Sequence, residues 1–77
     1  MPRYFFHTEN GHLVPDEDGQ ELADTDAAHD VALDTMGEIL RYQGRSFWET
    51  RHFRVIVTDD SQAEVVRLTT SASPSSN

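Results

Sequence analysis

The stretch DTDAAHDVALDTMGEILRYQ, residues 24–43, decides the fold of this chain. Its apolar residues recur at the spacing of helical turns and form one stripe, which is typical of an amphipathic helix that covers a sheet. The stripe comprises Ala28, Val31, Ala32, Thr35, Met36, Ile39 and Leu40. Asp24 is suited to cap the N-terminus, and Gly44 is suited to the left-handed conformation that often ends a helix. The sequence therefore predicts one central helix.

A strand and a turn precede this helix. Residues 3–7, RYFFH, are rich in aromatic side chains, which favours a strand. Asn10-Gly11 follows and favours a two-residue hairpin turn, because both residues tolerate a positive φ. In the register that this turn sets, Glu9 lies opposite His12.

The first hairpin has two faces, and the sequence leaves open which of them is buried. We expect the face with Tyr4, Phe6 and Leu13 to lie against the helix. The alternative buries Phe5 and Val14 instead. Both faces carry aromatic residues, so composition does not decide between them.

A second hairpin follows the helix. Residues 51–58, RHFRVIVT, alternate between apolar and polar side chains, and residues 63–69 form the last expected strand. A two-residue loop at residues 60–61 pairs Val55 with Val66 and brings the apolar sets of both strands onto one face. The connection before this hairpin carries Phe47 and Trp48, which we expect to close one end of the core.

The order of elements is β-β-α-β-β, an α+β fold with one helix packed on a small antiparallel sheet. Residues 1–69 form the expected single domain. Residues 70–77 are small and polar, and we expect a disordered Ser/Thr-rich tail. The two hairpins join either within one chain or between chains, because a lone hairpin is only marginally stable.

Composition restricts the function. The chain has 77 residues, no cysteine and a net charge of −8. Without cysteine it forms no disulfide and no thiolate metal site. The acidity disfavours nucleic acid and anionic membranes as partners. The sequence shows no signal region and no stretch of transmembrane length, so we expect a cytoplasmic protein.

The opening residues resemble a known family. The chain begins with Pro2-Arg-Tyr-Phe-Phe-His7, continues through Asn10-Gly11 and Pro15-Asp16, and reaches Gly19 and Glu21-Leu22. This resembles short bacterial proteins of a domain-of-unknown-function family, which begin PRYFFH and continue through D-x-x-G-x-E-L into an alanine-rich helix. The resemblance covers the chain from Pro2 to about Leu40. It implies a small bacterial, cytosolic domain with no assigned activity, cofactor or catalytic residue.

One set of residues suggests a metal site. In the expected register His7, Glu9 and His12 share a face of the first hairpin, and two imidazoles with a carboxylate are a ligand set that zinc accepts. The alternative is a solvated hairpin end. The sequence has no nucleophile motif and no phosphate-binding glycine loop, so we expect neither an enzyme nor a bound cofactor.

The side of the sheet away from the helix is the expected interaction face. It combines basic with apolar residues: Arg3, Phe5, His52, Arg54, Ile56, Val65 and Arg67. In the expected register Arg54 lies opposite Arg67, a like-charge pair. The alternative is an ordinary solvated sheet face with scattered apolar residues.

The leading functional hypothesis is a non-enzymatic interaction module. It self-associates, as a homodimer for example, or docks an unidentified protein partner through the open sheet face or an edge strand. The motivation is apolar surface on a chain too small for a large core. The alternatives are binding of single-stranded nucleic acid by the same face, through stacking on Phe5 and phosphate contacts, and the metal site of the first hairpin.

Overall fold

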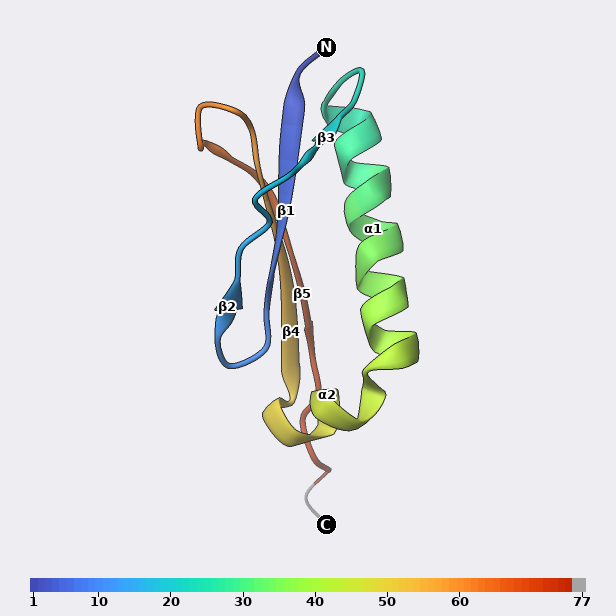
Figure 1. The fold of residues 1–77 in the computed structure, drawn as a ribbon. Coiled ribbons are helices and arrows are strands. Elements are labelled where there is room, and N and C mark those ends of the chain that lie inside the picture. The colour runs from blue at the N-terminus through green and yellow to red at the C-terminus, as the bar shows by residue number, and fades with distance from the viewer. Residues whose placement is uncertain (76–77) are drawn as a thin grey trace.

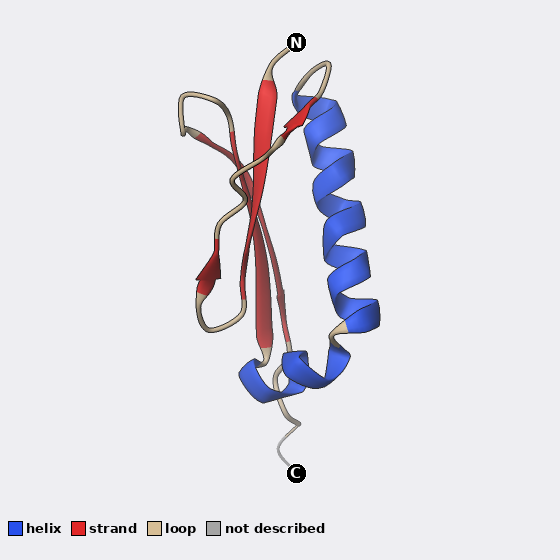
Figure 2. Ribbon diagram, viewed as in Figure 1, coloured by secondary structure: helices blue, strands red, loops and turns tan. Residues whose placement is uncertain are grey.

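Helix α1 (Thr25–Tyr42) lies along one face of an antiparallel sheet, as Figures 1 and 2 show. The computed structural model describes residues 1–75. Its other elements are β1 (Arg3–Glu9), β2 (Leu13–Val14), β3 (Gln20–Glu21), α2 (Gly44–Thr50), β4 (His52–Thr58) and β5 (Glu64–Ser71). The predicted α+β fold in the order β-β-α-β-β is confirmed, with a short strand β3 and a second helix α2 in addition.

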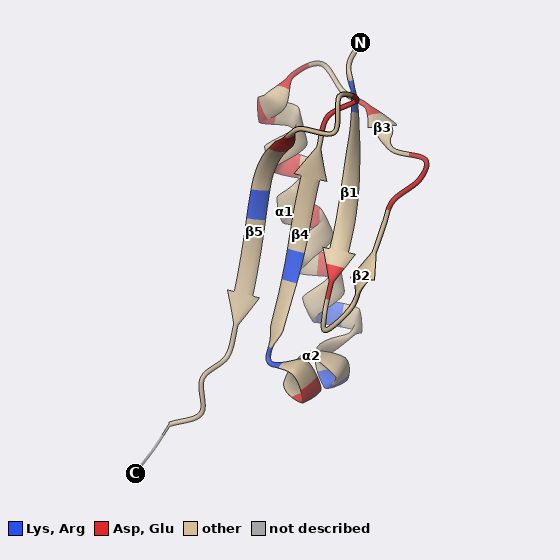
Figure 3. Ribbon diagram, turned by 90° about the vertical axis from the view of Figure 1, so that its left-hand side faces the viewer, with Lys and Arg blue, Asp and Glu red and all other residues tan. Residues whose placement is uncertain are grey.

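The two hairpins join into a single sheet within one chain. The strand order is β2-β1-β4-β5, and β3 also pairs with β1. All of these pairings are antiparallel. Pairing of β1 with β4, far apart in the sequence, therefore forms the centre of the sheet, and β5 forms one edge (Figure 3).

Helix α1 forms as predicted at its start and differs at its end. The side chain of Asp24 accepts a hydrogen bond from the Ala27 N–H at 2.9 Å, and the helix buries Ala28, Ala32 and Met36. Gly44 does not adopt the predicted left-handed conformation, because it begins α2. Arg51 ends α2 instead, with a φ of 64°. Neither helix within residues 1–75 is long and apolar enough to cross a membrane.

The core lies between α1 and the sheet. Its buried residues are Tyr4, Ala28, Ala32, Met36, Phe47, Phe53, Val55 and Val57, and Phe6 packs against them. The expected buried face of β1 is therefore confirmed. Of the two aromatic residues of α2, only Phe47 closes the end of the core as expected. Phe47 is buried, with its ring centroid 5.5 Å from that of Phe53, whereas Trp48 is 67% exposed.

The predicted register of the first hairpin is wrong by one residue. Thr8 pairs with Val14 and Glu9 with Leu13, so the loop has three residues rather than two. Of Asn10 and Gly11, only Gly11 has a positive φ, whereas a two-residue type I′ turn needs both. Because one residue of shift reverses the faces, Val14 lies on the helix side and Leu13 on the opposite side.

The predicted register of the second hairpin is wrong by two residues. Val55 pairs with Leu68, and a bulge interrupts the pairing near Thr58. The turn is longer than expected because the Asp59 carboxylate accepts hydrogen bonds from the N–H groups of Ser61 and Ala63, at 2.9 and 3.0 Å. A shift of two residues preserves the faces, so the apolar sets still coincide.

The last strand extends beyond its expected end. Thr70 and Ser71 pair with β4, and the N–H of Ala72 donates to the carbonyl of Arg51 at 3.0 Å. The last strand therefore ends at Ser71 rather than at the predicted residue 69. Residues 76–77 of the predicted tail lie outside the described residues.

Candidate functional site

The side of the sheet away from α1, called the open face below, carries most of the predicted interaction residues. Alternation along the strands places Arg3, Phe5, His52, Arg54, Ile56 and Arg67 there. Val65 is the exception, because it is the extra residue of the bulge in β5 and packs against the hydrophobic core.

The apolar part of the open face is smaller than expected. Phe5 and Ile56 are half-buried. The chain between β2 and β3 crosses the edge of β1 from the open face toward α1 (Figure 1). There Gly19 lies so close to Phe5 that an added Cβ would come within 2.9 Å of the ring. Leu13, 56% exposed, joins this face because of the altered register, and the predicted two-residue turn had placed it on the buried side.

The arginines of the open face are paired with acidic groups. Arg3 donates to the carbonyl of Asp18 at 2.7 Å and to the carboxylate of Glu21 at 3.4 Å. The other two pairs are Arg54 with Glu9 and Arg67 with Glu64. The predicted like-charge pair between Arg54 and Arg67 is wrong, because Arg67 lies opposite Ile56.

The pKa values of these carboxyl groups reflect the ion pairs. The hydrogen bond from Arg54 lowers the pKa of Glu9, and the hydrogen bond from Arg67 lowers the pKa of Glu64. Figure 3 shows the two arginines on β4 and β5. Each arginine of the open face therefore has an acidic partner, which weakens the attraction of this face for phosphate groups.

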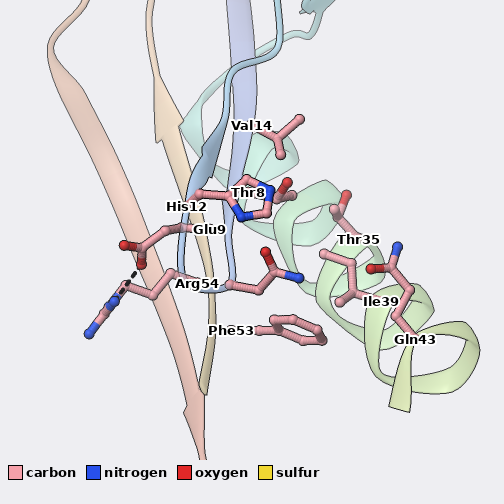
Figure 4. A pocket seen from close by; sticks show the side chains of 10 residues that line it. Thr8, Glu9, His12, Val14, Thr35, Ile39, Gln43, Phe53 and Arg54 are labelled. Atoms are coloured by element: carbon pink, nitrogen blue, oxygen red, sulfur yellow. Dashed lines mark hydrogen bonds and ion pairs between the residues drawn. The ribbon is translucent and has the colours of Figure 1, made fainter. Parts of the chain in front are cut away.

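The three predicted metal ligands do not come together. The Nδ1 of His7 accepts a hydrogen bond from the Asp16 N–H at 3.0 Å, and its Nε2 lies 3.0 Å from the hydroxyl of Thr58. Glu9 turns toward Arg54, whereas the ring of His12 lies on the side of the helix (Figure 4). Within residues 1–75, no group of three His, Cys, Asp or Glu residues is arranged to hold a metal ion.

The outer edge of β1 is closed by the chain that follows it. β2 and β3 pair with its two ends. Between them the carboxylate of Asp16 accepts hydrogen bonds from the N–H groups of Phe6, Asp18 and Gly19, each at 3.1 Å. Burial raises the pKa of Asp16, but these hydrogen bonds outweigh it and hold that pKa below its ordinary value. An incoming strand therefore finds this edge occupied.

The opposite edge of the sheet, the outer side of β5, is open. Within residues 1–75, β5 pairs with β4 and with no other strand. It contains neither proline nor lysine, and its features that protect an exposed edge are limited to the bulge at Val65 and the charged residues Glu64 and Arg67. Figure 3 shows β5 at the border of the sheet, away from β2 and β3.

Comparison with protein-family models gives a match. A family model described as Domain of unknown function (DUF6894) matches residues 3–71. The match extends from the first residue of β1 to the last residue of β5, and thus covers the whole sheet and both helices. No curated protein and no solved structure gave a match.

Proposed function

The chain belongs to this domain-of-unknown-function family, and from that premise we propose that it is a small non-enzymatic interaction module that self-associates through β5. The observation that carries the proposal is the difference between the two sheet edges. Asp16 and the short strands β2 and β3 close the edge of β1, whereas β5 is open.

An open edge strand presents a row of N–H and C=O groups that another strand can pair with. β5 is eight residues long, which provides a full-length template for antiparallel pairing. Its bulge lies near its start, at Val65, so the pairing with β4 is regular from Val66 to Ser71. This regular part is the proposed contact.

The local charge of β5 does not oppose a second copy of this chain as the occupant. With a net charge of −8, two copies repel one another over most of their surfaces. Within β5, however, the only charged residues are Glu64 and Arg67, and they form an ion pair at 2.9 Å. β5 therefore carries no net charge, and this limits the repulsion between two copies at the contact.

Packing supports the same occupant. Val66 and Leu68 lie on the helix side of β5 and are only half-buried, at the border of the core. Antiparallel pairing about a two-fold axis at Leu68 places this residue beside its own copy and continues the apolar row across the contact. The cores of the two copies then join. The joined core buries more apolar surface per chain than a single chain of 77 residues can bury alone.

The test is the solution mass by light scattering, from micromolar to millimolar protein, at low and high salt. We expect a dimer that persists at high salt, because backbone pairing and apolar contact are little screened. Arg67→Glu places like charges at the contact and yields a monomer. Arg45→Glu makes the same change at an exposed site on α2 and leaves the dimer intact.

Two outcomes contradict the proposal. One is a wild-type monomer at every concentration, and the other is equal behaviour of the two variants. Binding of single-stranded nucleic acid has less support, because the open-face arginines Arg3, Arg54 and Arg67 are paired with acidic groups.

A further inference from the structure

A cavity of about 340 Å³ lies between the first hairpin and the C-terminal half of α1 (Figure 4). Its walls come from β1, from the loop after it, from β2, from α1 and from β4. The residues that matter most for its chemistry are Asn10, His12, Val14, Ile39, Gln43 and Phe53. None of them belongs to β5, so this site is separate from the proposed dimer contact.

Part of the cavity wall is apolar: Val14, Ile39 and Phe53 are the three apolar members of its ten lining residues, and the other seven are polar or charged. Phe53, which is 2% exposed, contributes the edge of the core, and Ile39 extends the apolar stripe of α1. Val14 completes the wall, because its pairing with Thr8 turns it toward the helix. Val14 is 50% exposed, so a ligand here would remove apolar surface from water.

The polar groups of the cavity are available to a ligand. The side chains of Asn10, His12 and Gln43 make no hydrogen bond to any other residue within 1–75. They come from two separate elements, the hairpin loop and the end of α1, and both border the same cavity. Small-molecule sites commonly combine an apolar body with a few polar groups of this kind.

The charges around the cavity favour a neutral ligand. Arg54 also lines it, but the carboxylate of Glu9 bonds to this guanidinium. The net charge of −8 disfavours an anion.

We propose that this cavity binds a small neutral molecule with an apolar, ring-sized body and one hydrogen-bonding group. The body contacts Val14, Ile39 and Phe53, and the polar group bonds to an amide or to His12 at the mouth. The register of the first hairpin is decisive, since the predicted two-residue turn would have turned Val14 away from the helix.

The first experiment is a titration of the full chain with phenol, and NMR spectra of the protein measure the binding. We expect saturable shifts of the Val14 and Ile39 methyl signals and of the Phe53 ring. Benzoate has the same ring with a negative charge, and we expect it to bind at least about tenfold more weakly, a difference of about 1.4 kcal/mol. Shifts that do not saturate, or that spread evenly over the protein, overturn the proposal. If benzoate binds as tightly as phenol, the proposal that the ligand is neutral is wrong.

A pair of matched variants tests the location. Thr35 lines the cavity, and Thr35→Leu fills part of it, so the phenol response is lost. Thr25→Leu makes the same change at the exposed first residue of α1 and leaves the response intact. If Thr35→Leu does not fold, Gln43→Leu replaces it as the test variant, because Gln43 is exposed at the mouth of the cavity. We expect Gln43→Leu to weaken phenol binding. Wild-type affinity in the folded cavity variants overturns the proposal.

Discussion

The carboxylate of Asp16 accepts a hydrogen bond from the backbone N–H of Phe6 at 3.1 Å. This N–H lies on the outer edge of β1, between the part that pairs with β3 and the part that pairs with β2. A side chain thus supplies the acceptor that a neighbouring strand would otherwise supply. The edge is thereby satisfied without a regular strand, and it offers no donor to another chain.

Asp16→Ala should lower the free energy of unfolding by about 1–3 kcal/mol, because the N–H of Phe6 loses its acceptor. The same carboxylate also holds the turn through the N–H groups of Asp18 and Gly19. Urea unfolding at neutral pH, followed by circular dichroism, measures the change. Glu17→Ala, at an exposed neighbouring position, is the control and should have little effect. Equal stability of the two variants would show that the carboxylate is dispensable.

The contribution of Asp16 should depend on pH. Its pKa in the folded chain lies below the ordinary value of 3.8, because the backbone hydrogen bonds outweigh the effect of burial. A depressed pKa means stability that is fully present above pH 3.8 and is lost as the pH falls through the folded value. The difference between wild type and Asp16→Ala should therefore shrink in acid. A difference that grows below pH 3.8 would contradict the assignment.

Two glycines should respond to alanine with opposite signs. Gly19 has a φ of 71°, and an added Cβ would lie 2.8 Å from the carbonyl oxygen of Tyr4. Gly19→Ala should cost about 1–3 kcal/mol. Gly37 lies in α1 with open space around it, so Gly37→Ala should stabilise the protein by about 0.5–1 kcal/mol. Thermal unfolding of both variants measures the two changes in stability. If both variants are stabilised, or both destabilised, the described geometry at one of the two glycines is wrong.

The two ion pairs of the open face should be separable by titration. Arg54→Met removes the hydrogen bond that lowers the pKa of Glu9, so that pKa should rise toward its ordinary value of 4.5. Arg67→Met should raise the pKa of Glu64 and affect Glu9 much less. Carbon-13 NMR of the carboxyl groups measures both. A larger response of Glu9 to Arg67→Met than to Arg54→Met would exclude the pairing described here.

The two aromatics of α2 should differ in their contribution to stability. Phe47 is 9% exposed and packs against Phe53, so Phe47→Ala should cost about 3–5 kcal/mol. Trp48 is 67% exposed, and Trp48→Ala should cost no more than about 1 kcal/mol. Urea unfolding of the two variants gives the comparison. Equal losses would mean that both side chains close the core, as the sequence had suggested.

The candidate site was only partly predictable. Alternation along β1 and β4 correctly placed Phe5, Arg54 and Ile56 on the open face, because the period of a strand is a local property. The pairing of Arg54 with Glu9 was missed, since it depends on which strands become neighbours. The cavity was also missed, because the predicted two-residue hairpin placed Val14 on the face away from the helix.

The sequence by itself determined the helix, its Asp24 cap, the order of the main elements and the core-facing sides of α1 and β4. These follow from hydrophobic periodicity and capping, which act between residues near one another in the chain. Only the tertiary structure decided the hairpin registers and the pairing of β1 with β4. Register depends on a single positive φ at Gly11 and on the hydrogen bonds of Asp59, and strand order depends on contacts between distant segments.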